Sequence, residues 1–228
     1  MKHALLSLAL LLAFITACAP LTVTTPPPEP QVVRVTYSAT LRPWVDALHA
    51  CARQTPEIAL IIDERSLASP DLETADLTLW FGEPPQGYTG TAFNLGADEI
   101  VILAGSNLNS SHVSPLRLRE IYSGAESDIQ PWSYGQGSDI RLIFDQVVLA
   151  GAPPSLDVLL APNPAAMLEA IAANPSAIGY VPKSWLSGDM QPIAVDGDAF
   201  WQPVLALTAT EPQGGLREFI ACLQTTAE

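Results

Sequence analysis

The chain has 228 residues, of which 48% are hydrophobic and 15% are charged, and its formal net charge at pH 7 is −14. A negative charge of this size argues against binding to nucleic acid, or to acidic lipid through a basic patch, because both need clustered Lys and Arg side chains. A small anionic ligand stays possible, since a nest of backbone N–H groups acts at close range, whereas salt screens distant surface charge within about 10 Å.

The N-terminal segment is typical of an export signal. It begins with Met1-Lys2-His3, continues with an apolar run over residues 4–15 and ends on Ile-Thr-Ala-Cys at residues 15–18. The run is too short to cross a hydrocarbon layer of about 30 Å as a permanent helix. Its end resembles the bacterial lipobox, which implies lipidation of Cys18 and anchoring to the outer face of the cytoplasmic membrane, or elsewhere in the cell envelope. An ordinary secretory signal with an incidental cysteine is the alternative.

Residues 19–31 are rich in proline and contain almost no large apolar side chain. Such a sequence favours the extended polyproline II form, at about 3.1 Å per residue. We therefore expect a spacer that holds a domain roughly 35 to 40 Å from the lipid.

The globular part alternates strand and helix patterns. The predicted strands cover residues 32–37, 58–62, 76–81, 99–104, 156–160, 177–181 and 203–208. The predicted helices cover residues 43–54, 114–122, 140–149, 164–173 and 216–223. This β-α-β order predicts parallel sheets with helices on their faces. The stretch that ends at Gly137 is expected to be irregular.

Two cysteines remain after Cys18, namely Cys51 and Cys222, and each lies in a predicted helix near one end of the globular part. An exported protein meets conditions that permit disulfides. The pattern is compatible with a bridge between them or with two buried thiols, because sequence provides no distance. We expect no zinc site, since no Cys or His lies at ligand spacing around them, and we expect no other metal or cofactor.

Two loops have the chemistry of a ligand site. In α/β sheets, ligands bind at the carboxyl ends of strands, where loops lead into helix N-termini with free N–H groups. Ser38 and Thr40 follow the first predicted strand, and Ser138 and Asp139 precede the helix that carries Arg141. For either loop alone, helix capping is the commoner explanation, because Ser, Thr and Asp are preferred N-cap residues.

Several segments, in the same order along the chain, resemble the phosphate-type periplasmic binding proteins of ABC transporters. The matching pieces are Ser38-x-Thr40-Leu41-x-Pro43, Val101-Ile102-Leu103 with Asn107, the segment 114–124, Trp132, Gly137-Ser138 with Arg141 and Phe144, and Ala177-Ile178-Gly179-Tyr180-Val181. The resemblance runs from residue 32 to the last predicted helix. It implies an α/β, two-lobed, type 2 periplasmic-binding-protein fold, each lobe a mostly parallel sheet flanked by helices, with ligand bound between the lobes.

The resemblance also implies how the chain is divided. The expected parts are a lipoprotein signal peptide (1–17), the lipidated cysteine with its linker (18–31), a first lobe (32–97), a second lobe (98–190) and a return to the first lobe (191–228).

The chain departs from the family at its anion-binding loop. Asp139-Ile140 stands where the family has Gly-Thr, and the arginine that usually precedes the loop is missing. A phosphate dianion beside an unpaired carboxylate would meet a repulsion of about 1 to 4 kcal/mol. Either Arg42 or Arg141 would have to offset this charge, or Asp139 would accept a hydrogen bond from a protonated or neutral ligand.

The sequence favours a monomeric, lipid-anchored solute-binding protein that captures a small polar ligand, first of all an oxyanion such as phosphate, for an ABC permease. The candidate ligand contacts are Ser38, Thr40, Ser138, Asp139 and Arg141, with Asp76 as a weaker candidate, because a strand-end aspartate more often caps a turn. The alternative is a surface lipoprotein of the same fold that acts as a sensor or interaction module without transport.

Enzymatic activity is not expected. The chain has no Gly-x-Ser-x-Gly elbow and no His-Glu-x-x-His motif. After removal of the signal, His49 and His112 are the histidines that remain, and His49 lies in a predicted helix where a surface or packing role is the simpler explanation.

Overall fold

The computed structural model describes residues 29–108, 110–188 and 190–226. The predicted export signal, Cys18 and most of the proline-rich linker lie outside these residues. Within the described ranges, no helix combines the length and the apolar character needed to cross a membrane.

Eight strands form one mixed sheet in the order β2-β1-β3-β10-β4-β8-β6-β7. They are β1 (Gln31–Tyr37), β2 (Ile58–Glu64), β3 (Leu77–Phe81), β4 (Thr91–Ala104), β6 (Gln130–Tyr134), β7 (Leu159–Ala161), β8 (Ala177–Pro182) and β10 (Phe200–Thr208). A separate parallel pair consists of β5 (His112–Val113) and β9 (Ala194–Val195). The helices are α2 (Val45–Gln54), α3 (Pro115–Tyr122), α4 (Asp139–Val147), α5 (Pro164–Ala173) and α6 (Gly214–Thr226), with 3-10 turns η1 (Ala39–Trp44) and η2 (Lys183–Trp185).

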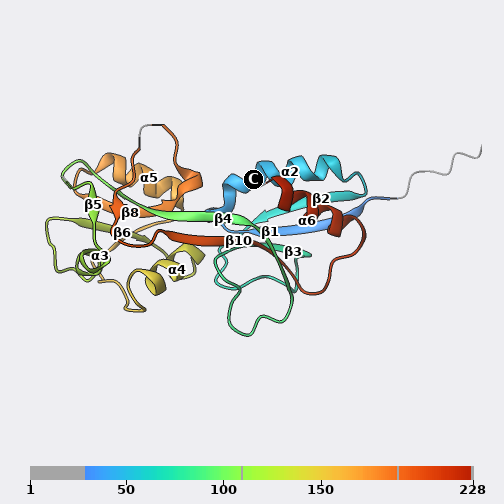
Figure 1. Cartoon of the computed structure of the whole chain (residues 1–228), viewed down its shortest axis with the longest axis horizontal. Helices are drawn as coiled ribbons and strands as arrows, with labels where there is room; N and C mark the ends of the chain where they lie inside the picture. The colour runs from blue at the N-terminus through green and yellow to red at the C-terminus, as the bar shows by residue number, and fades with distance from the viewer. Residues whose placement is uncertain (1–28, 109, 189, 227–228) are drawn as a thin grey trace, which may run out of the picture.

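The direction of strand pairing divides this sheet into two lobes. At one end β2, β1 and β3 are parallel, and at the other end β8, β6 and β7 are parallel. Between them, β4 and β10 pair antiparallel with each other and with their outer neighbours. Figure 1 shows β4 and β10 running from a first lobe with β1 to β3, α2 and α6 to a second lobe with β6, β8 and α3 to α5. The predicted α/β architecture is confirmed.

Local sequence explains most of these elements. Strands β3 and β8 are buried along their whole length, as expected of inner strands covered on both faces. Ser114 caps the start of helix α3, because its side chain accepts the Arg117 backbone N–H, and Gly124 follows the end of the helix with a φ of 84°. Helix α5 begins in the same way, with Asn163 as the cap of the Ala166 N–H.

Several elements differ from the sequence-based prediction. The short strands β5 and β9 were not predicted, β7 covers Leu159–Ala161 where a strand over 156–160 was expected, and the helix predicted from residue 43 begins as the end of η1. The largest differences concern β6 and β4. Strand β6 lies in the stretch that was expected to be irregular, and β4 begins eight residues before the predicted start at residue 99. Strand β6 contains Pro131 and only five residues, so its own pattern is weak, but β7 and β8 pair with it on either side. The first half of β4 includes Asn94 and Gly96 and depends on its pairing with β10, which shifts register between Val204 and Leu205.

The core continues through both lobes. One cluster of buried side chains extends from Val33 and Leu79 in the first lobe, through Ile102 on β4, to Phe144 and Tyr180 in the second. The rings of Phe144 and Tyr180 stack at 3.7 Å between centroids. The long strands therefore connect the lobes by shared packing as well as by hydrogen bonds.

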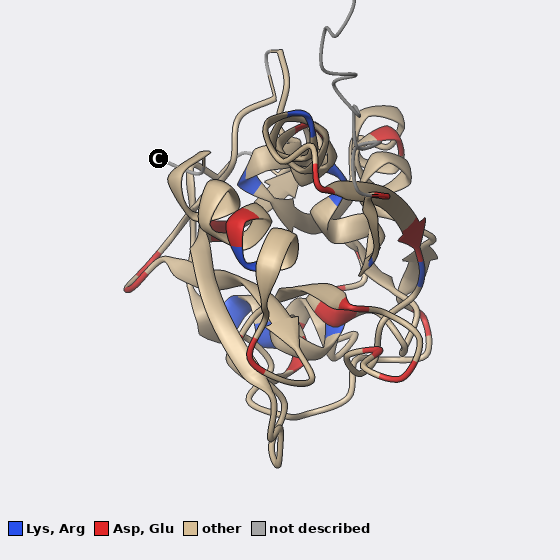
Figure 2. Cartoon of the chain, turned by 90° about the vertical axis from the view of Figure 1, so that its right-hand side faces the viewer, with Lys and Arg blue, Asp and Glu red and all other residues tan. Residues whose placement is uncertain are grey.

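Figure 2 presents the molecule from one end and shows acidic residues on loops, helices and strand ends, with basic residues interspersed among them. Most of the ion pairs are exposed or only half-buried, such as Lys183 with Glu99 and Arg117 with Glu126. Such pairs contribute little to stability, at most about 1 kcal/mol each.

A disulfide joins Cys51 on α2 to Cys222 on α6, with the two Cα atoms 5.7 Å apart. The sequence pattern had left open whether these residues form a bridge or remain two buried thiols. The bridge connects positions 171 residues apart and fastens the last helix of the chain to the first lobe.

Replacing both cysteines with alanine should lower the free energy of unfolding by about 2 to 5 kcal/mol, because a long loop is no longer closed in the unfolded chain. Urea unfolding followed by circular dichroism measures this. Dithiothreitol should destabilise the wild type by a similar amount and leave the double variant unchanged. Equal stability of the oxidised wild type and the variant would contradict the prediction.

Candidate ligand-binding site

The first side of the candidate site is the loop between β1 and η1. Strand β1 ends at Tyr37, and Ser38 continues in an extended conformation before the 3-10 turn begins. The Ser38 side chain makes no capping hydrogen bond to η1. Its hydroxyl is therefore available to a partner from elsewhere in the chain, although Ser38 is buried.

The second side is the start of α4, which follows β6 through a short turn. Ser138 occupies the N-cap position, but its side chain makes no capping bond. Asp139, the first helical residue, instead accepts the Ile140 backbone N–H on its own carboxylate at 2.8 Å. A carboxylate at this end of a helix is stabilised by the helix dipole.

The two sides meet at the Asp139 carboxylate. The Ser38 hydroxyl donates to Oδ2 at 2.5 Å, and the Thr40 hydroxyl donates to Oδ1 at 2.6 Å. Ser38, Thr40 and Asp139 are 4%, 2% and 3% exposed. Three of the residues singled out in the sequence thus form one buried contact between the lobes.

Burial controls the electrostatics of this contact. It raises the pKa of the Asp139 carboxyl above its ordinary value of 3.8, although the hydrogen bonds from Ser38 and Thr40 act in the opposite direction. The same carboxylate adds to the effect of burial in raising the pKa of Tyr134. The Asp139 carboxylate is stabilised by hydrogen bonds from hydroxyl and amide groups rather than by a salt bridge.

A cavity of about 180 Å³ opens beside the contact and is lined by both lobes. Its polar lining comes from Ser38, Thr40, Glu64, Arg65, Ser66, Ser138, Asp139 and Asn163. Ser66, which follows β2, also donates to the Gly137 carbonyl oxygen at 3.0 Å and so links the lobes a second time. The cavity lies at the carboxyl ends of β1 and β2, where α/β sheets place ligands.

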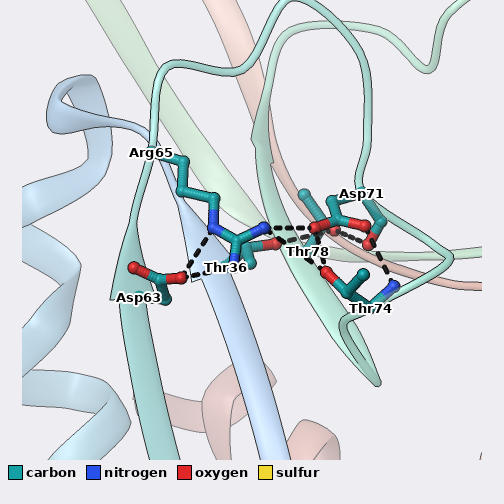
Figure 3. A network of polar contacts seen from close by, with 6 residues as sticks. All are labelled: Thr36, Asp63, Arg65, Asp71, Thr74 and Thr78. Carbon is teal, nitrogen blue, oxygen red and sulfur yellow. Dashed lines mark hydrogen bonds and ion pairs between the residues drawn. The ribbon is translucent and has the colours of Figure 1, made fainter.

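Arg65 is a cavity residue that the sequence analysis did not identify. Its guanidinium lies between two carboxylates, with Asp63 at 2.6 Å and Asp71 at 2.8 Å (Figure 3). Hydrogen bonds from Thr74 lower the pKa of Asp71, so that this partner is ionised. The run Asp-Glu-Arg-Ser at residues 63–66, at the carboxyl end of a strand parallel to β1, was the signal that could have revealed it.

Neither arginine that was expected to offset Asp139 does so directly. Arg42 forms two hydrogen bonds to Glu64, at 2.9 and 2.7 Å, and lies over the Trp185 ring. Arg141 is buried and donates to the Tyr134 carbonyl oxygen at 2.7 Å and to Asp145 at 3.1 Å. Both arginines are outside the set of residues that line the cavity.

Asp76 also lies apart from the cavity. Its carboxylate accepts the Arg34 backbone N–H at 2.8 Å, and it lines a separate hollow near Thr208 and Leu216. The structure therefore brings together Ser38, Thr40, Ser138 and Asp139 from the predicted set, and it leaves Arg141 and Asp76 outside.

No family model and no curated protein sequence matches this chain. Solved structures do resemble it. One is a protein from Clostridium perfringens assigned as a phosphate ABC transporter substrate-binding protein, with bound phosphate: the TM-score is 0.73 at 16% identity, over 85% of this chain and 93% of that chain. An ABC-type phosphate transport receptor from Vibrio cholerae gives 0.68 at 15% identity, over 85% and 94% of the two chains.

A regulatory protein shares the same architecture. The CcmR regulatory domain from Synechocystis, in complex with 2-PG, has a TM-score of 0.65 at 14% identity, over 87% of this chain and 98% of that chain. At such identities the likeness establishes the fold. The chain has the type 2 periplasmic-binding-protein fold, as the family resemblance in its sequence implied.

The Ser38→Ala variant should be less stable than the wild type by about 1 to 3 kcal/mol, because a buried carboxylate oxygen loses its hydrogen-bond donor. Urea unfolding at pH 7 measures the difference. Ser187→Ala, at an exposed position, is the control and should change stability by less than about 0.5 kcal/mol. Equal effects of the two substitutions would contradict the role assigned to Ser38.

The stability difference between the wild type and Asp139→Asn should depend on pH. The folded-state pKa of Asp139 is raised, so the folded wild type binds this proton more tightly than the unfolded chain. As pH rises from 3.8 through the raised folded-state pKa, the wild type should lose stability relative to Asp139→Asn. Urea unfolding of both proteins between pH 4 and 7 tests this, and a constant difference would contradict it.

Proposed function

We propose that this protein is an exported binding protein that captures a small polar solute between its lobes and presents it to an ABC permease. The observation that carries the proposal is the cavity beside Ser38 and Ser138, which is lined by polar side chains of both lobes. Binding sites in such folds are concave, few in number and placed between domains or at strand ends.

The mechanism that fits this architecture is lobe movement around a solute. Strands β4 and β10 connect the lobes, so bending near their middle would open and close the cavity. A solute that contacts both lobes stabilises the closed arrangement by the difference between its affinities for the closed and open forms. No chemical step is required of the protein.

The N-terminal segment supports a proposed localisation at the membrane. Lipid on Cys18 and the proline-rich linker would hold the lobes within reach of a permease at the outer face of the cytoplasmic membrane. The fold shared with proteins named for phosphate transport supports this proposal at the level of architecture.

The geometry adds a condition on the solute. Phosphate was the first candidate from the sequence, but the hydroxyls of Ser38 and Thr40 already donate to Asp139. A phosphate dianion would compete for these donors and be repelled by about 1 to 4 kcal/mol. A neutral or cationic solute that donates hydrogen bonds would instead find a carboxylate acceptor at the cavity wall.

A second function is favoured by one observation, the direct contact of Asp139 with Ser38 and Thr40. Because the chain's own side chains make this contact between the lobes, the protein would act as a surface interaction module or sensor that carries no cargo. The two functions differ in whether a solute stabilises the folded protein.

Thermal unfolding across a solute panel separates them. The mature chain with Cys18→Ser would be heated with neutral polyols, amino acids, amines, phosphate and sulfate. A solute present at a hundredfold excess over its dissociation constant should stabilise the protein by about 2.7 kcal/mol.

The control compares the same substitution inside and outside the cavity. Ser66→Ala, inside the cavity, should weaken this stabilisation, whereas Ser187→Ala should leave it intact. A flat response to the whole panel would reject solute transport and favour the interaction module.

A further inference from the structure

We infer that Asp139 acts as an internal ligand: its carboxylate occupies an oxyanion site made by other parts of the chain and keeps free oxyanions out of the cleft. The inference rests on the proposed function, because it states which class of solute the same cavity rejects. It concerns one contact between the β1–η1 loop and α4.

The contact has the form of a bound anion. Two hydroxyls, from Ser38 and Thr40, each reach a different oxygen of one carboxylate, and the Ile140 N–H adds a third donor. An ionised carboxylate only accepts hydrogen bonds, so both hydroxyls serve as donors here. Hydroxyl and amide donors that converge on a charged, multi-oxygen group would suit a small oxyanion equally well.

Burial limits the alternative partners of these donors. Ser38 and Thr40 are almost fully buried, so their hydroxyls have little access to bulk water. Without the carboxylate they would be left unsatisfied, which is costly in a buried site. A ligand that supplies oxygen acceptors at the same place would recover those hydrogen bonds.

The contact also joins the lobes. Ser38 and Thr40 belong to the first lobe and Asp139 to the second. The hydrogen bond from Ser66 to the Gly137 carbonyl oxygen is a further bond between the same two lobes. In hinged binding proteins, the solute supplies such bridging contacts when the lobes close. In this chain the protein itself supplies them.

Charge then decides which solutes enter. The cavity of about 180 Å³ touches Asp139 directly, so an oxyanion there lies within a few Å of a carboxylate. Its two other charged lining residues, Glu64 and Arg65, are already paired with Arg42, Asp63 and Asp71. Like-charge repulsion at this range lowers affinity by about tenfold or more.

Removing the carboxylate should therefore create an oxyanion site. In Asp139→Gly the hydroxyls of Ser38 and Thr40 lose their acceptor while the adjacent cavity becomes larger. Isothermal titration with phosphate and with sulfate, on the mature chain with Cys18→Ser, compares this variant with the wild type. The variant should bind at least one of the two anions about tenfold or more tightly than the wild type does.

Three further variants make the comparison specific. Asp139→Ser removes the charge without placing glycine in the helix, and it should show the same gain. Asp198→Gly makes the same change of net charge at an exposed position and should titrate like the wild type. Adding Ser38→Ala and Thr40→Val to either variant at position 139 should abolish the gain, because the donors are then gone.

Tight binding of phosphate or sulfate by the wild type overturns the inference, and so does a lack of gain in both position-139 variants. Cooperative urea unfolding establishes beforehand which of these two variants is folded, and a single folded one suffices for the comparison. The proposed function fails by a different result, which is the absence of any solute that stabilises the wild type. A gain in oxyanion affinity in the position-139 variants would support the inference whether or not such a solute is found.

Discussion

The contact of the Asp139 carboxylate with the hydroxyls of Ser38 and Thr40 is the constraint on which the candidate site depends. A buried carboxylate is costly unless hydrogen bonds satisfy it, so the loop after β1 and the start of α4 must lie together. This requirement sets how closely the lobes approach each other beside the cavity. It also gives the cavity a negative wall, which distinguishes it from a site built only of donors.

Some contacts stabilise each lobe by itself, and other elements connect the two lobes. The Cys51–Cys222 bridge fastens α6 to α2 inside the first lobe, and the stacked rings of Phe144 and Tyr180 fill the second. Among the strands in the described part of the chain, β4 and β10 run through both lobes. Because the core also continues through both lobes, a change in their separation would bend β4 and β10, and polar contacts across the cavity would add to this shared packing in holding the lobes together.

The candidate site could be predicted in part from sequence. Ser38, Thr40, Ser138 and Asp139 were identified because each lies where a strand ends or a helix begins, and those positions converge in any parallel α/β sheet. Arg141 was placed near the ligand by resemblance, but its side chain turns to the Tyr134 carbonyl oxygen. Arg65 was missed because its importance depends on β2 lying beside β1, which the local pattern does not encode.

The sequence by itself determined the α/β class, the order of most helices and strands and the chemistry available at their ends, because periodicity, capping residues and turn residues act over a few positions. Tertiary structure decided the rest. Strand β6 and the first half of β4 exist through pairing with distant strands, and the partners of Cys51 and Asp139 come from 171 and about 100 residues away. A local pattern reports that a side chain is buried, whereas only the folded chain decides what it is buried against.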